Sequence, residues 1–84
     1  MKPHTKIYFK HFKIAFNESG EHDFIPCERC GAEAVDIHHV HGRGKDMDKI
    51  DNLMALCREC HAKAHNGGMT SSELNYYHQR KLNK

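Results

Sequence analysis

Apolar and polar positions divide the 84-residue chain into three parts. In residues 5–17 the apolar side chains recur at helical spacing, which predicts a helix, although the Tyr and Phe content leaves a strand as the alternative. The apolar side of this helix would consist of Tyr8, Phe9, Phe12, Ala15 and Phe16. An adjacent basic stripe would consist of Lys6, Lys10 and Lys13.

Two short strands and a helix are predicted in the middle of the chain. Residues 34–40 have the β-branched content of a strand, and residues 53–56 form a second short apolar run. Between them, Gly42 and Gly44 predict a flexible, charged loop. From residue 58 the sequence favours a helix, which ends at a stop signal. That signal is Asn66-Gly67-Gly68.

The last part of the chain, residues 70–83, is predicted to be a helix that packs back on a small core. Thr70 and Glu73 have the spacing of a capping box, which marks a helix N-terminus. Helical spacing also places a modest apolar stripe on this segment. The stripe would contain Leu74, Tyr77 and either His78 or Lys81.

Composition indicates that this core needs further support. Only 38% of the residues are hydrophobic and there is no Trp, so a chain this short has little apolar surface to bury. Four Cys and nine His, by contrast, are residue types that bind metals. No segment is apolar enough for a membrane span or a signal core, so we expect a cytoplasmic protein without a membrane partner.

Charge is unevenly distributed along the chain. Residues 1–16 carry four lysines and no acid, whereas residues 17–36 carry six acidic residues and one arginine. Basic residues again predominate near the C-terminus. Basic ends around an acidic middle fit a protein whose periphery contacts phosphates, with ordinary solvated lysines as the alternative.

The four cysteines form two CxxC units, Cys27 with Cys30 and Cys57 with Cys60, separated by 26 residues. Two such units can complete a tetrahedral shell of four thiolates around one zinc ion. In a reducing compartment zinc is favoured over disulfides, and no βαβ pattern supports redox pairs. Because four thiolates leave no open position, we expect this zinc to be structural.

The histidines suggest a second metal site. His61 and His65 are four residues apart and share one face of the predicted helix. His38 and His39 are adjacent on a strand and therefore point to opposite sides. If His38 turns towards the helix, the three nitrogens form a metal site with open positions, and His39 is left as a free imidazole. This division suits phosphodiester hydrolysis, in which an imidazole accepts a proton from water and a metal stabilises developing charge.

Other polar residues have candidate roles in the same region. Asn52 can bond to the strand or loop backbone and hold His39 in its reactive orientation. Arg43 and Lys45 are within reach of a phosphate, and Arg43 is the better bidentate partner. For Arg43 the alternative is a solvated loop cation. No direct role is assigned to His4, His11, His22 and His78.

The segment DIHHVHGRGKDMDKIDNLMALCRECHAKAH resembles the HNH motif of the ββα-metal, or His-Me finger, nucleases. The two CxxC units place it with the zinc-bearing type. This resemblance covers residues 27–65 and implies a small α+β fold. Such a fold has a ββα-metal core held by a four-cysteine zinc site, here with flanking N- and C-terminal helices.

The resemblance also implies roles for the motif residues. By it, His38 and His61 are ligands of the catalytic metal. His39 is the general base, and Asn52 orients that base. His65 matches the last histidine of the motif, which is a ligand in some members such as the colicin DNases.

The function implied is that of a metal-dependent endonuclease that nicks or cuts double-stranded DNA. Its catalytic ion would be Mg²⁺, Mn²⁺, Ni²⁺ or Zn²⁺, and its products 5′ phosphate and 3′ hydroxyl ends. Similar compact proteins occur in phage genomes, where the site of action is the host cytoplasm, and in restriction or mobile-element systems. A homodimer or a larger DNA-processing complex would allow both strands to be cut.

We expect one domain over residues 1–84. It would consist of a basic N-terminal segment (1–26), the zinc-bearing core (27–67) and the C-terminal helix (70–83). The alternative function is a zinc-bearing module that binds nucleic acid or a partner protein without catalysis.

Overall fold

The computed structural model describes residues 2–42, 44 and 46–83. In chain order the elements are α1 (Pro3–His11), β1 (Asp36–His39), the 3-10 helix η1 (Ile50–Asn52), β2 (Leu53–Leu56), α2 (Arg58–His65) and α3 (Ser71–Leu82). The predicted small α+β fold is confirmed, with a ββα core flanked by an N-terminal and a C-terminal helix. No helix in the described part of the chain is long and apolar enough to cross a membrane.

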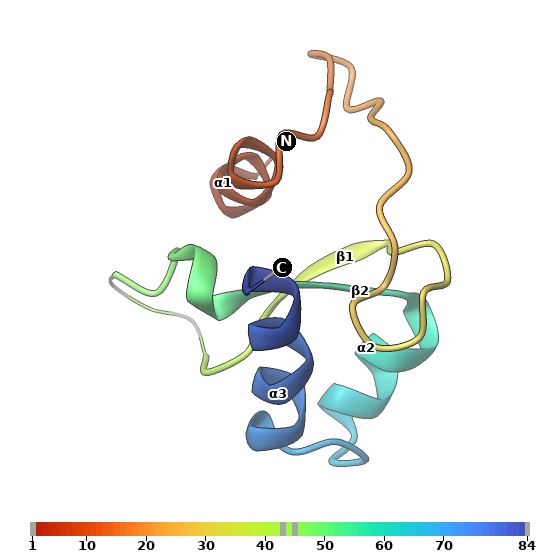
Figure 1. Ribbon diagram of the computed structural model, residues 1–84, viewed down its shortest axis with the longest axis vertical. Coiled ribbons are helices and arrows are strands. Elements are labelled where there is room, and N and C mark those ends of the chain that lie inside the picture. The colour runs from red at the N-terminus through yellow and green to blue at the C-terminus, as the bar shows by residue number, and fades with distance from the viewer. Residues whose placement is uncertain (1, 43, 45, 84) are drawn as a thin grey trace.

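Strands β1 and β2 form a two-stranded antiparallel sheet. Ile37 lies opposite Ala55, and His38 lies opposite Met54. Because side chains alternate along a strand, these two pairs point to opposite faces. Helix α1 covers one face, and α2 and α3 lie on the other (Figure 1).

Each face of the sheet has its own small core. Under α1 the buried residues are Tyr8, Phe9, Ile25, Ala34, Leu53 and Ala55. On the face of α2 and α3 they are Cys27, Val40, Met54, Leu56, Cys57, Cys60, Met69 and Leu74. Three cysteines thus belong to the second core, so the cysteine cluster and the apolar packing form one unit.

Helix α1 begins earlier and ends earlier than the sequence predicts. It starts at Pro3, whose fixed φ suits the first turn of a helix. It ends at His11 because Lys13 adopts a left-handed conformation with φ of 56°. The Ile14 N–H then donates to the Phe9 carbonyl at 2.8 Å, which closes the last turn.

The residues after α1 form a turn in place of the predicted helical continuation. Phe16 pairs with His22 in an isolated bridge, and the Asn17 N–H donates to the Glu21 carbonyl at 2.9 Å. Lys13 is therefore not part of a helical stripe with Lys6 and Lys10, as the spacing had suggested. The pairing across this turn outweighs the helical periodicity of the apolar residues.

The remaining elements follow the predicted signals closely. β2 has the predicted bounds, and β1 is shorter than the predicted strand at both ends. The Cys57 side chain caps α2 by accepting the Cys60 N–H at 3.5 Å. The Thr70 hydroxyl caps α3 by accepting the Glu73 N–H at 3.1 Å, as the capping-box spacing predicts.

A fully buried ion pair connects the first CxxC unit to α3. His78 Nδ1 donates to Glu28 Oε1 at 2.6 Å, and His78 Nε2 donates to the Ile50 carbonyl at 2.6 Å. Glu28 Oε2 accepts the Tyr8 hydroxyl at 2.6 Å and the Ala55 N–H at 2.9 Å. Since both ring nitrogens of His78 face acceptors, the ring is an imidazolium. One carboxylate thus joins α1, β2 and α3.

Candidate active site

The four cysteines form no disulfide and gather in one cluster. The Sγ atoms of Cys30 and Cys57 are 3.6 Å apart, and those of Cys30 and Cys60 are 3.8 Å apart. A tetrahedral zinc ion with Zn–S bonds of about 2.3 Å holds its sulfurs roughly 3.8 Å apart. The four side chains are therefore positioned to bind a metal ion of the zinc type.

Local structure prepares this cluster for a metal. Gly31 has φ of 83°, a conformation that favours glycine, and its N–H donates to the Cys27 carbonyl at 2.9 Å. Burial raises the pKa of Cys60 to about 12. Burial also opposes ionisation of Cys27, but hydrogen bonds from the backbone of Cys57 and Cys30 lower the pKa of Cys27 to about 7. Cys27 can thus supply a thiolate near neutral pH, whereas Cys60 gives up its proton to a bound metal.

Three histidines form a second cluster, at the junction of β1 and α2. The donor atoms of His38, His61 and His65 all lie within 4.8 Å of one another. The Nε2 atoms of His61 and His65 are 3.0 Å apart, as their spacing on α2 predicts. Three imidazoles with partial solvent exposure suit a transition-metal ion that keeps open positions. The structure therefore brings together the three residues for which the sequence predicted metal binding.

Asp36 supports this cluster, although the sequence analysis did not identify it. Its Oδ2 lies 2.9 Å from His61 Nδ1. A proton on Nδ1 then points at the carboxylate, which leaves the Nε2 lone pair of His61 directed at the cluster. Asp36 is two residues before His38 and shares its face of β1, and this spacing was the available signal.

His39 lies on the opposite face of β1, towards α1. Its side chain is 6% exposed, and its Nε2 lies 2.7 Å from Asp48 Oδ1. The ring of His4, from α1, packs edge-on against it with centroids 4.6 Å apart. His39 Nδ1 is buried and has no hydrogen-bond partner within residues 2–42, 44 and 46–83. Neither Asp48 nor His4 was predicted to be near this residue.

The Asn52 side chain forms hydrogen bonds with the backbone of the segment that follows His39. Its Oδ1 accepts the His41 N–H at 2.7 Å. Its Nδ2 donates to the carbonyls of Gly42 at 3.1 Å and Met47 at 2.9 Å. The amide is buried and contacts the loop backbone, not the His39 ring. It can therefore position His39 only through the backbone on either side of the loop.

The cations predicted near the site are distributed differently. Arg43 and Lys45 lie outside the described residues, so their contacts are not part of this geometry. Lys6 and Lys10 are exposed one turn apart on α1. These two lysines are the part of the predicted basic stripe that the helix carries.

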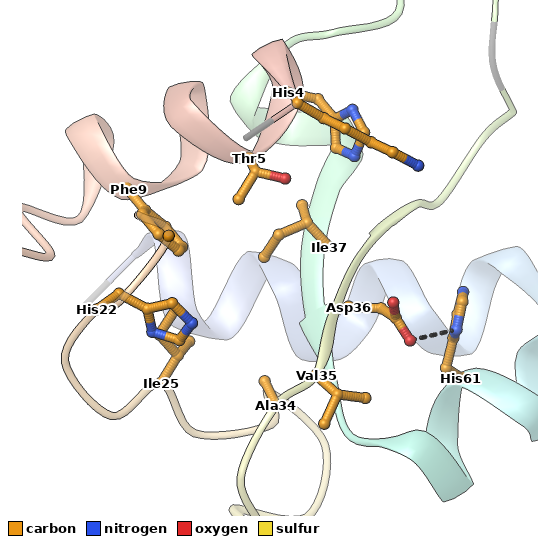
Figure 2. Close-up of a pocket in the computed structure, with 12 residues that line it drawn as sticks. His4, Thr5, Phe9, His22, Ile25, Ala34, Val35, Asp36, Ile37 and His61 are labelled. Atoms are coloured by element: carbon orange, nitrogen blue, oxygen red, sulfur yellow. Dashed lines mark ion pairs between the residues drawn. The ribbon is translucent and has the colours of Figure 1, made fainter. Parts of the chain in front are cut away.

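A cavity of about 330 Å³ runs between α1, β1 and the segment before β1. Its apolar lining includes Phe9, Ile25 and Ile37. Figure 2 shows Ile37 and Asp36 of β1 between His4 and His61. Two of its lining residues belong to the sites described above: His4 packs on His39, and His61 is part of the three-histidine cluster. The cavity therefore lies beside both sites.

One comparison with known proteins matches this region. A family model described as HNH endonuclease matches residues 27–67. No curated protein and no solved structure gave a match to the chain. The matched segment contains both CxxC units, both strands and α2. Residues 27–67 are therefore a domain of the HNH endonuclease family, in its form with two CxxC units.

Proposed function

We propose that the chain is a metal-dependent DNA endonuclease that hydrolyses phosphodiester bonds. The observation that carries this proposal is that two neighbouring histidines of one short strand have different surroundings. His38 joins a three-histidine cluster on one face of β1, and His39 is held on the other face. The proposed proton acceptor and one of the proposed metal ligands are thus adjacent residues of one strand.

In this proposal His38, His61 and His65 hold a divalent ion. When bound, the ion supplies Lewis-acid stabilisation of charge on the phosphate and on the leaving 3′ oxygen. Asp36 keeps His61 in the tautomer that directs Nε2 at the cluster. A second site, formed by the four cysteines, holds a zinc ion with a structural role.

His39 accepts a proton from the attacking water. Its Nδ1 is buried, so Nε2 is the nitrogen that can meet a water molecule. To do so, Nε2 exchanges its contact with Asp48 for one with the water, and the half-exposed Asp48 side chain has room to move. Asn52 keeps the backbone beyond His39 fixed while this exchange takes place.

The substrate we propose is double-stranded DNA, cut to leave 5′ phosphate and 3′ hydroxyl ends. Arg43 is proposed to contact a phosphate, and the exposed Lys6 and Lys10 of α1 are proposed to contribute positive charge. All 84 residues would act as one domain around the zinc-bearing core. The buried Glu28–His78 pair, which joins the core to α3, supports this unity.

The test is cleavage of a supercoiled plasmid with Mg²⁺, Mn²⁺, Ni²⁺ or Zn²⁺ added singly. We expect nicked or linear product with at least one ion, and the ratio of the two distinguishes single-strand from double-strand cutting. His39→Ala should lose cleavage by a factor of about 100 or more while its circular dichroism is unchanged. His11→Ala, an exposed histidine on α1, is the matched control and should cut normally.

A second candidate is a zinc-bearing module that binds nucleic acid or a partner protein without cutting it. The contact of His39 Nε2 with Asp48 favours this candidate, because the proposed base is engaged in the structure. It predicts an intact plasmid with all four ions and DNA binding that is unaffected by His39→Ala. Cleavage by the wild type that His39→Ala abolishes would exclude it.

A further inference from the structure

We propose that His4, His39 and Asp48 form a third metal site, which takes a transition-metal ion such as Zn²⁺ and thereby inactivates the base. The three residues come from α1, β1 and the loop before η1. The effect on activity rests on the proposed function. Ion binding itself does not depend on it.

The three donor atoms already lie close together. All of them are within 4.8 Å of one another. His39 Nε2 is 2.7 Å from Asp48 Oδ1, and the rings of His4 and His39 are 4.6 Å apart. A tetrahedral zinc ion with bonds of about 2.0 to 2.2 Å holds its donors roughly 3.4 Å apart. Small side-chain movements, which separate His39 from Asp48, therefore suffice to admit an ion.

The donor set selects the kind of ion. Two imidazoles and a carboxylate suit Zn²⁺, Ni²⁺ and similar ions, whereas Mg²⁺ prefers oxygen ligands. Three protein ligands leave an open position for water. The Asp48 side chain is 47% exposed, so an ion can enter from solvent, and the 6% exposed His39 side chain provides an inner ligand.

This site is separate from the two described above. It shares no residue with the four-cysteine cluster or with the three-histidine cluster. His39 and His38 are neighbours in sequence but lie on opposite faces of β1. An ion bound by His4, His39 and Asp48 would therefore be additional to the ions of the other two clusters.

Binding there has a direct chemical consequence. A bond from the nitrogen of His39 to a metal uses the lone pair that would otherwise accept a proton. His39 Nδ1 is buried and cannot replace it. Excess Zn²⁺ should therefore inhibit cleavage that another, more weakly bound ion supports.

The first test measures ion binding alone. The 84-residue chain is equilibrated with Zn²⁺ by dialysis, and bound zinc is counted by elemental analysis. We expect His4→Ala and Asp48→Ala each to bind one zinc ion per chain fewer than the wild type, and His11→Ala to bind the same number. Circular dichroism verifies that each variant is folded. Wild-type zinc content in both folded variants would overturn the site, whether or not the protein cleaves DNA.

The second test measures inhibition. Nicking supported by Mg²⁺ or Mn²⁺, whichever is active, is titrated with Zn²⁺, and each variant is normalised to its own rate without zinc. The zinc concentration for half-inhibition should rise about tenfold or more in His4→Ala relative to His11→Ala, because a ligand is lost. Equal half-inhibition in these two variants would show that zinc does not act through this site. If the protein cuts no DNA, the proposed function is wrong, but the first test still shows whether the ion binds.

Discussion

His78 carries two protons in the folded protein, because both of its ring nitrogens donate to buried acceptors. Burial alone would lower its pKa, but the hydrogen bond and charge of Glu28 raise the pKa above the ordinary histidine value. Asp51 acts in the same direction. A histidine that binds its proton more tightly in the folded state stabilises the fold fully below its unfolded pKa of about 6.5. That contribution is lost as the pH rises through the folded pKa.

We therefore expect the loss of stability in His78→Gln to depend on pH. Near pH 6 its free energy of unfolding should fall by about 3 to 5 kcal/mol, the cost of breaking a buried pair, and the deficit should shrink towards about pH 9. Urea unfolding with saturating Zn²⁺ measures the difference from wild type. The exposed His11→Gln is the control. A deficit that is equal at both ends of this range would contradict the protonation we assign to His78.

Motif spacing identified the residues of the four-cysteine and three-histidine clusters but not the residues that contact His39. His61 and His65 share a helix face whatever the rest of the fold does, so their proximity is readable from the sequence. Asp48 reaches His39 only through the path of the loop between them. His4 reaches it only because α1 docks on that face of the sheet. Such contacts depend on tertiary packing, which the local pattern does not contain.

Among the elements, those with a physical end signal were predicted best. Helix α3 begins after Thr70, as the capping-box spacing indicates, and α2 begins directly after Cys57, whose side chain caps it. Helix α1 had no predicted C-terminal signal. It ends where Lys13 takes a left-handed conformation, and no glycine marks that position. Periodicity alone therefore extended it too far.

The N-terminal cap of α3 allows a prediction about the stability of this helix. Thr70→Ala removes the hydroxyl that accepts the Glu73 N–H, so the free energy of unfolding should fall by about 1 kcal/mol. The effect concerns the whole protein because α3 carries buried Leu74. Chemical denaturation measures it, and exposed Ser72→Ala is the control. If the two variants were equally stable, the cap would contribute nothing to the fold.

The whole molecule depends on the cysteine cluster because each of its two cores is small. Cys27, Cys57 and Cys60 lie within the core beneath β2 and α3. An ion bound there ties the first CxxC unit to the start of α2. Without the ion, no bond links the two CxxC units. The few apolar side chains of each core would then have to hold the fold alone, which cores this small rarely do. In this chain the metal and the core are thus parts of one structure.

Removal of zinc should therefore unfold the protein. We expect a strong chelator to abolish most of the helical circular dichroism signal, and Zn²⁺ but not Mg²⁺ to restore it, because thiolates select zinc. Cys57→Ser should remain largely unfolded in zinc. His61→Ala should stay folded and keep its tightly bound zinc, because His61 belongs to the other cluster. An unchanged spectrum after verified zinc removal would mean that the apolar cores suffice, and unfolding of His61→Ala would mean that the two clusters are not separable.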